Sequence, residues 1–125
     1  MSTDGREHPR APLATAVELE LPDGATLRGT TVNASRAGIE VECDRATRDR
    51  IFPAGEPPTP ADRPALRVRL RLPPGGGEVL EANAVGVTSR RVAEARYRLG
   101  IQFRKLEPQD FRRLEQLIYQ AGRSR

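Results

Sequence analysis

Two arginines in the N-terminal segment have a type and spacing that could bind an anionic ligand. Arg6 and Arg10 lie four positions apart among polar residues. A guanidinium group is a planar fork of N–H donors, which matches two phosphate oxygens or the O6 and N7 edge of guanine. The same spacing also occurs among Arg63, Arg67 and Arg71, so spacing alone does not identify a site.

A second group of candidate residues lies in segment 32–43, at Asn33, Ser35 and Gly38. Short amide and hydroxyl side chains either hydrogen-bond the backbone of a turn or present polar groups to a ligand. Glycine permits a positive φ or the close approach of another group to the backbone. This segment therefore fits either a tight turn between two strands or a polar ligand-binding surface.

The composition argues against several kinds of active site. His8 is the only histidine and Cys43 the only cysteine. The sequence therefore does not support a His- or Cys-based metal cluster, a disulfide within the chain or a Ser-His-Asp arrangement. Most carboxylates alternate with apolar residues, as on the solvated face of a strand. We therefore expect no enzyme, no metal and no cofactor.

The basic residues suggest what kind of partner the chain binds. The net charge is +4, and Lys105 is the only lysine among 21 basic residues. An excess of arginine favours an anionic partner, although a nucleotide bias toward Arg, Ala, Pro and Gly codons would produce the same excess. Residues 1–10 contain no apolar run, and no stretch approaches the length of a membrane span. These features predict a cytoplasmic protein.

Six strands are predicted from alternating apolar and polar residues. They lie within 16–21, 25–32, 39–43, 66–72, 79–89 and 96–103. Short antiparallel strands with Gly and Pro turns favour an all-β fold, a small six-stranded antiparallel β-barrel. At 125 residues we expect one domain over 1–125, with the barrel at 13–106.

The remaining segments are expected to surround this barrel. Residues 1–12 lack large apolar side chains and predict a flexible N-terminal arm. Segment 44–52 suits a short helix, whereas the five prolines of 53–64 predict an exposed, peripheral loop without helix or ladder. A C-terminal α-helix is predicted at 107–121, ended by Gly122, with an apolar stripe that covers an open side of the barrel.

The order of these features resembles the PilZ family of cyclic di-GMP receptors over nearly the whole chain. The order is an RxxxR arm, a hairpin, a [D/N]xSxxG turn, further strands, a strand ending in Gly100-Ile101-Gln102-Phe103 and a terminal helix. The resemblance implies a bacterial receptor whose arm becomes ordered when cyclic di-GMP binds and which signals to a protein partner. It also implies that five residues bind the ligand: Arg6, Arg10, Asn33, Ser35 and Gly38.

Two differences from the family and two alternative functions follow. Gly5 stands where members often have another arginine, which bears on whether one ligand molecule or a stacked pair binds, and Asn33 stands where aspartate is common.

One alternative is a PilZ-like protein-interaction module without nucleotide binding. The other is a basic barrel that binds nucleic acid through the arginines of strand 66–72, although the few aromatic residues fall mostly on predicted core stripes and leave no stacking platform.

Overall fold

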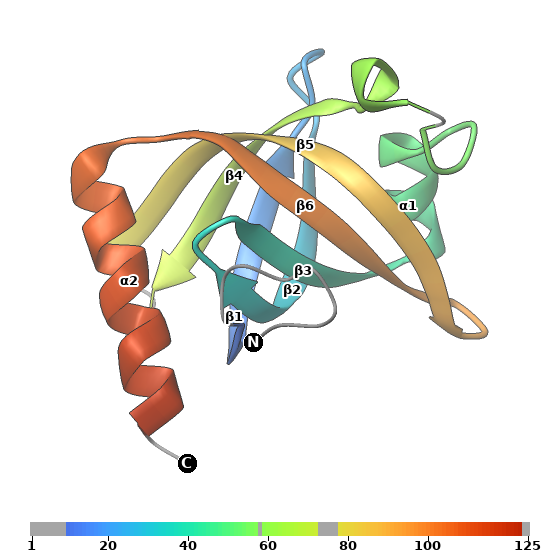
Figure 1. Cartoon of the computed structure of the whole chain (residues 1–125). Helices are drawn as coiled ribbons and strands as arrows, with labels where there is room; N and C mark the ends of the chain where they lie inside the picture. Colours follow the sequence, from blue (N-terminus) through green and yellow to red (C-terminus); the bar gives the residue numbers. More distant parts are fainter. Residues whose placement is uncertain (1–9, 58, 73–77, 124–125) are drawn as a thin grey trace.

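The computed structural model describes residues 10–57, 59–72 and 78–123. Within these residues the chain forms six strands, two α-helices and one short 3-10 helix (Figure 1). The elements are β1 (Ala11–Glu20), β2 (Thr26–Ser35), β3 (Gly38–Asp44), α1 (Arg45–Ile51), η1 (Pro60–Asp62), β4 (Ala65–Leu72), β5 (Glu78–Ala93), β6 (Arg96–Leu106) and α2 (Pro108–Arg123).

The strands form a closed barrel in the order β1-β2-β3-β6-β5-β4. Each strand pairs antiparallel with its neighbours, and β1 closes the barrel by pairing with β4. The predicted six-stranded antiparallel β-barrel with a C-terminal helix is therefore confirmed. Because β6 lies between β3 and β5, it joins the β2–β3 hairpin to the second half of the barrel.

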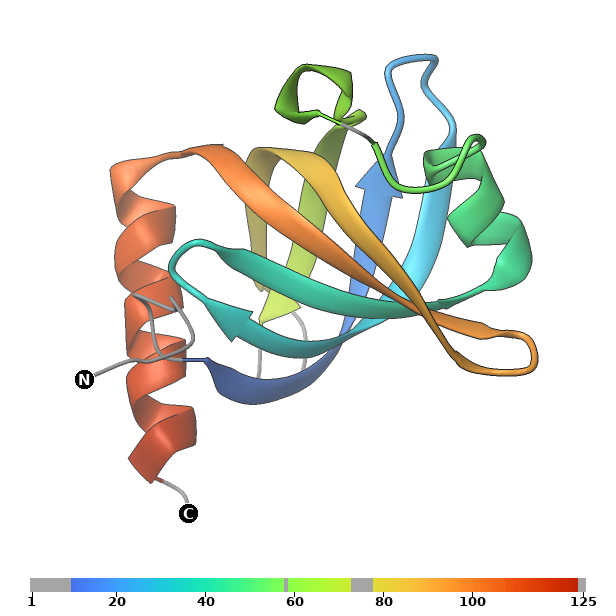
Figure 2. The ribbon, with the colours of Figure 1, turned by 45° about the vertical axis from the view of Figure 1, so that its right-hand side comes forward.

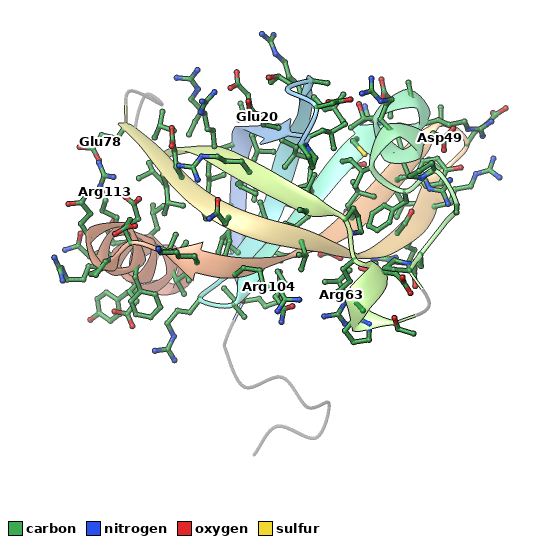
Figure 3. The ribbon with its side chains drawn as sticks, turned by 90° about the horizontal axis from the view of Figure 1, so that it is seen from above. Glu20, Asp49, Arg63, Glu78, Arg104 and Arg113 are labelled. Carbon is green, nitrogen blue, oxygen red and sulfur yellow. The ribbon has the colours of Figure 1, made fainter. Side chains whose placement is uncertain are left out.

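The core follows the alternation seen in the sequence. In β4 the apolar residues from Leu66 to Leu72 are buried, whereas the arginines between them are exposed. The charged residues labelled in Figure 3 all lie on the outside of the barrel. Cys43 is buried in β3, and burial raises the pKa of its thiol to about 11, so this side chain stays protonated and unreactive at neutral pH.

Helix α2 lies against one side of the barrel and α1 at the other (Figure 2). Leu114 of α2 is fully buried in the core, and Leu117 and Ile118 pack against it. The helix extends through Gly122 to Arg123, so the predicted end at Gly122 is wrong. Docking of the apolar stripe outweighs the roughly 1 kcal/mol helix penalty of a glycine. No helix in the described ranges is long and apolar enough to cross a membrane.

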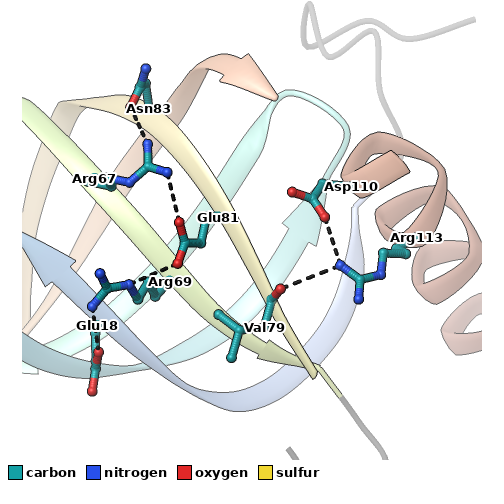
Figure 4. Close-up of polar contacts among 8 residues, drawn as sticks. All are labelled: Glu18, Arg67, Arg69, Val79, Glu81, Asn83, Asp110 and Arg113. Carbon is teal, nitrogen blue, oxygen red and sulfur yellow. Dashed lines mark hydrogen bonds and ion pairs between the residues drawn. The ribbon is translucent and has the colours of Figure 1, made fainter. Parts of the chain in front are cut away.

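Polar contacts fix α2 to the barrel at its N-terminal end (Figure 4). The carboxylate of Asp110 is buried in the first turn, where an acidic group is favourable. Arg113 donates to Asp110 at 2.8 Å and to the backbone carbonyl of Val79 in β5 at 3.5 Å. Arg36, in the turn after β2, pairs with Glu115 of α2 at 3.1 Å.

Strand β1 begins earlier than predicted. Its first residues pair with β2 as Ala11 with Ala34 and Pro12 with Asn33, before a register shift between Pro12 and Thr15. This part of the strand consists of small residues, which show no clear hydrophobic alternation. Residues 11–12 therefore belong to the barrel rather than to the predicted arm, and Arg10 directly precedes β1. The rest of the arm lies outside the described residues.

The loop at 53–64 differs from its predicted form in two ways. It contains η1, a single helical turn that begins at Pro60, where proline is tolerated because the first helical N–H needs no partner. It is also attached to β5 rather than peripheral. The amide of Gly86 donates to the Pro64 carbonyl at 2.9 Å, and the amide of Ser89 donates to the Glu56 carboxylate at 2.9 Å.

Candidate functional site

Three of the predicted site residues lie together where β1 begins and β2 ends. The Nε of Arg10 donates to Oδ1 of Asn33 at 2.6 Å, and its NH1 donates to Oγ of Ser35 at 3.4 Å. The pairing of β1 with β2 explains this arrangement, because it brings the residue before Ala11 next to the last residues of β2. The barrel thus holds one guanidinium group of the arm at a defined place.

The orientation of Asn33 is set by a residue that the sequence analysis did not single out. Asn33 Nδ2 donates to Oε1 of Glu40 at 2.6 Å, across the β2–β3 ladder. An ionised carboxylate only accepts hydrogen bonds, so the amide nitrogen must face Glu40 and the amide oxygen must face Arg10. Oε2 of Glu40 also lies 3.7 Å from the guanidinium of Arg90. The alternation of the sequence predicts only a solvated strand residue at Glu40.

Ser35 both stabilises the turn and contacts Arg10. Its side chain is buried, with 1% of its surface exposed, and its hydroxyl accepts a hydrogen bond from the Ala37 amide at 3.1 Å. A hydroxyl that bonds the amide two residues later is a common way to stabilise a turn. Asn33 and Ser35 lie in β2, so only residues 36–37 connect the two strands. The Ser35 hydroxyl thus serves both as part of a tight turn and as part of the polar surface that contacts Arg10.

Gly38 is needed for close packing rather than for a positive φ. Among the described glycines, only Gly24 and Gly55 have a positive φ. A Cβ at Gly38 would collide with the Ile101 carbonyl oxygen and lie 3.1 Å from the Cα of Gln102. The group that approaches this backbone is therefore strand β6.

A pocket of about 280 Å³ adjoins this group of residues. Pockets that enclose drug-sized ligands measure about 300–1,000 Å³, so this one suits part of a dinucleotide. Asn33 and Ser35 do not line it but hydrogen-bond to Arg10, which does. Arg6 lies outside the described residues. The polar and glycine residues that line the pocket are Arg10, Gly38, Arg63, Thr88, Gly100 and Gln102.

A larger pocket of about 480 Å³ contains none of the predicted site residues. It is lined mainly by apolar groups, together with the polar residues Glu20, Arg67, Asn83 and Arg104. Among the residues that the structure places, no group of three or more His, Cys, Asp or Glu side chains could hold a metal ion. The predicted residues therefore point to the smaller pocket.

Two of the three arginines of β4, Arg67 and Arg69, pair with neighbouring carboxylates (Figure 4). Arg67 donates to Glu81 at 2.7 Å and Arg69 donates to the other oxygen of the same carboxylate at 3.0 Å. Arg67 and Arg69 lower the pKa of Glu81, which therefore stays ionised. Arg69 also lies 3.7 Å from Glu18. A strand face with this pairing is a poor surface for a phosphate backbone, which requires uncompensated positive charge.

Comparison with solved structures finds proteins of the same fold. The chain is similar to the Bacillus subtilis inhibitor of motility (MotI/DgrA), with a TM-score of 0.73 and 16% identity over 97% of this chain and 52% of that one. It is also similar to the PilZ domain of Escherichia coli YcgR with c-di-GMP, with a TM-score of 0.64 and 20% identity over 96% of this chain and 93% of that one.

A third similar structure is the K. pneumonia MrkH-c-di-GMP complex, with a TM-score of 0.71 and 18% identity over 96% of this chain and 55% of that one. The chain thus spans about half the length of MotI/DgrA and of MrkH. No curated protein matches the sequence. The family described as PilZ domain matches residues 4–120, nearly the whole chain. The chain therefore belongs to the PilZ domain family.

Proposed function

We propose that the chain is a cytoplasmic bacterial receptor for cyclic di-GMP, and not an enzyme. The observation that carries the proposal is the placement of Arg10, which Asn33 and Ser35 hold at the edge of a pocket. Two similar structures, the PilZ domain of YcgR with c-di-GMP and the MrkH-c-di-GMP complex, support the same ligand class.

The chemistry of the site suits a ligand with two phosphates and two guanines. The Arg10 guanidinium can donate two parallel hydrogen bonds to a phosphate or to a guanine edge, and Arg6 supplies a second fork four residues earlier. Asn33 and Ser35 position Arg10, which reduces the side-chain entropy lost on binding. The negative ligand also compensates the repulsion between the two arginines.

Binding is tested by isothermal titration calorimetry with cyclic di-GMP. Replacing Arg6 or Arg10 with alanine should cost about 2–5 kcal/mol of binding free energy, at roughly tenfold in affinity per 1.4 kcal/mol. Replacing Asn33 or Ser35 with alanine should cost less, about 0.5–1.5 kcal/mol.

The matched control for these variants is Arg28→Ala. Arg28 is an exposed arginine toward the start of β2, the strand that ends at Ser35. Its replacement should leave affinity unchanged. The proposal fails if the wild-type protein gives no binding heat, and the assigned roles fail if both arm variants bind within about twofold of wild type.

We also propose that the arm becomes ordered on binding and that a protein partner detects this change. Ala11 is already paired with β2, so the ordering applies to the residues before it. A ligand that contacts both arginines offsets the entropy of fixing this segment only if Asn33 and Ser35 contribute as well.

Hydrogen exchange with and without cyclic di-GMP measures this ordering. The amides of residues 5–8 and of Arg10 should become protected when the ligand binds, while the Ala11 amide serves as an internal reference; Pro9 has no amide hydrogen. Equally fast exchange in both states would show that the arm is not a clamp. Strong protection before the ligand is added would show that it is not a switch.

A further inference from the structure

We propose that Arg63 and Gln102 form a guanine-binding edge of the pocket that Arg10 lines. This inference rests on the proposed function and adds a binding role outside the two family motifs. Arg63 comes from the proline-rich loop and Gln102 from β6, and both line the same pocket as Arg10 and Gly38.

The backbone on both sides of Arg63 is fixed. Arg63 follows η1, and its amide donates to the Pro60 carbonyl at 3.3 Å. The Thr59 hydroxyl donates to the Asp62 carboxylate at 2.8 Å, which closes the same turn. On the other side, the Pro64 carbonyl accepts from the Gly86 amide of β5. Figure 3 shows Arg63 beside η1, outside the barrel. The loop therefore presents this side chain from a defined position.

The side chains of Arg63 and Gln102 offer both donors and acceptors. Arg63 NH1 donates to Oε1 of Gln102 at 3.3 Å. The guanidinium has only donors, whereas the amide of Gln102 has donors and an acceptor. A phosphate oxygen only accepts. Guanine has the O6 and N7 acceptors together with N–H donors on its ring and amino group. The mixed pair is therefore complementary to a guanine edge more fully than to a phosphate.

Two glycines of the ladder between β3 and β6, Gly38 and Gly100, line the pocket beside this pair. Gly38 pairs with Gln102 and Gly100 pairs with Glu40, so these four residues share one face of the two strands. Two of the four are glycines and lie diagonally across the ladder. Beyond them, the Thr88 hydroxyl accepts from the Gly100 amide at 3.1 Å, next to a register shift in β5. The Ile101 carbonyl and the Thr88 hydroxyl fill the space where side chains of Gly38 and Gly100 would lie, so the room for a base is the pocket of about 280 Å³ that these residues line.

The test is titration of Arg63→Ala, Arg63→Lys and Gln102→Ala with cyclic di-GMP, with Arg28→Ala as the control. A bidentate arginine–guanine contact predicts a loss of at least about fivefold for Arg63→Ala. Lysine keeps the charge but lacks the fork, so Arg63→Lys should lose nearly as much. Gln102→Ala should also weaken binding. All variants should melt like the wild type, because Gln102 is exposed and Arg63 is only partly buried.

Competition with cyclic di-AMP distinguishes a base contact from a phosphate contact. Adenine has an amino donor where guanine has the O6 acceptor, so loss of Arg63 should weaken cyclic di-GMP more than cyclic di-AMP. Equal losses for both nucleotides would assign Arg63 to a phosphate and overturn the inference. If the wild type binds and both Arg63 variants and Gln102→Ala keep its affinity, the guanine-binding role of Arg63 and Gln102 would be overturned, but the proposed function would stand. A wild type that does not bind cyclic di-GMP would overturn the proposed function as well.

Discussion

Replacing Gly38 with alanine tests the packing of the site directly. The added Cβ would collide with the Ile101 carbonyl and lie 3.1 Å from both the carbonyl carbon of Ile101 and the Cα of Gln102. All three contacts are with backbone atoms, so no side-chain rotation relieves them. The start of β3 and the facing part of β6 must separate, which also breaks the 2.8 Å hydrogen bond from the Phe103 amide to the Ala37 carbonyl.

The cost can be estimated from these contacts. Overpacking costs about 1–3 kcal/mol, and a lost backbone hydrogen bond costs about 0.5–1.5 kcal/mol. The free energy of unfolding should therefore fall by about 1.5–4.5 kcal/mol. For a domain of this size, 1 kcal/mol corresponds to roughly 3–5 °C in melting temperature, so Tm should fall by about 5–20 °C.

Gly100→Ala is the matched control, since Gly100 lies on the same face of the same two strands. Its Cβ would meet the hydroxyl of Thr88, a side-chain group that can rotate away. We expect a clearly smaller loss of stability, measured for both variants by thermal unfolding followed by circular dichroism. A Tm for Gly38→Ala within about 2 °C of wild type, or a larger fall in Gly100→Ala, would refute the packing argument.

Three further predictions follow from the contacts. Glu40→Ala should weaken cyclic di-GMP binding about 2- to 10-fold in calorimetry, although Glu40 does not line the pocket, because Asn33 loses the group that orients its amide; unchanged affinity would contradict this. The Thr47 amide and hydroxyl lower the pKa of Asp44, so this cap stabilises the fold above about pH 4 and is lost as pH falls through the lowered pKa; Asp44→Asn should lose less stability between neutral pH and acid in urea unfolding, and an equal loss would argue against the cap. Changing the three exposed β4 arginines to glutamine should matter little for nucleic acids, since the wild type should bind DNA only weakly in a gel shift; tight binding at physiological salt would favour the nucleic-acid alternative.

The elements that the sequence predicts best are those with long periodic patterns. The alternation in β4 and the apolar stripe of α2 each report which face is buried, and both are confirmed. The start of β1 was missed because Ala11 and Pro12 carry too little apolar surface to produce a pattern.

The missed parts of the site depend on contacts between distant segments. Arg63 shares its spacing with other arginines, and only the attachment of its loop to β5 brings it to the pocket. Glu40 has the alternation of a solvated residue, and its role follows from the β2–β3 register opposite Asn33. Register and loop attachment are set by the whole barrel, so the local pattern does not reveal them.

The attachment of the proline-rich loop also covers a strand edge of the barrel. Strand β5 pairs with β4 only as far as Val85, yet it continues to Ala93 with β6 as its partner on one side. The other side of this stretch is an open strand edge, which in general invites pairing with another chain and aggregation. The loop covers this edge by accepting hydrogen bonds from the amides of Gly86 and Ser89. Its prolines lack the N–H donors that would extend the sheet. Shortening the loop between Phe52 and Pro64 would therefore expose the unpaired edge of β5, and the chain would self-associate through this strand.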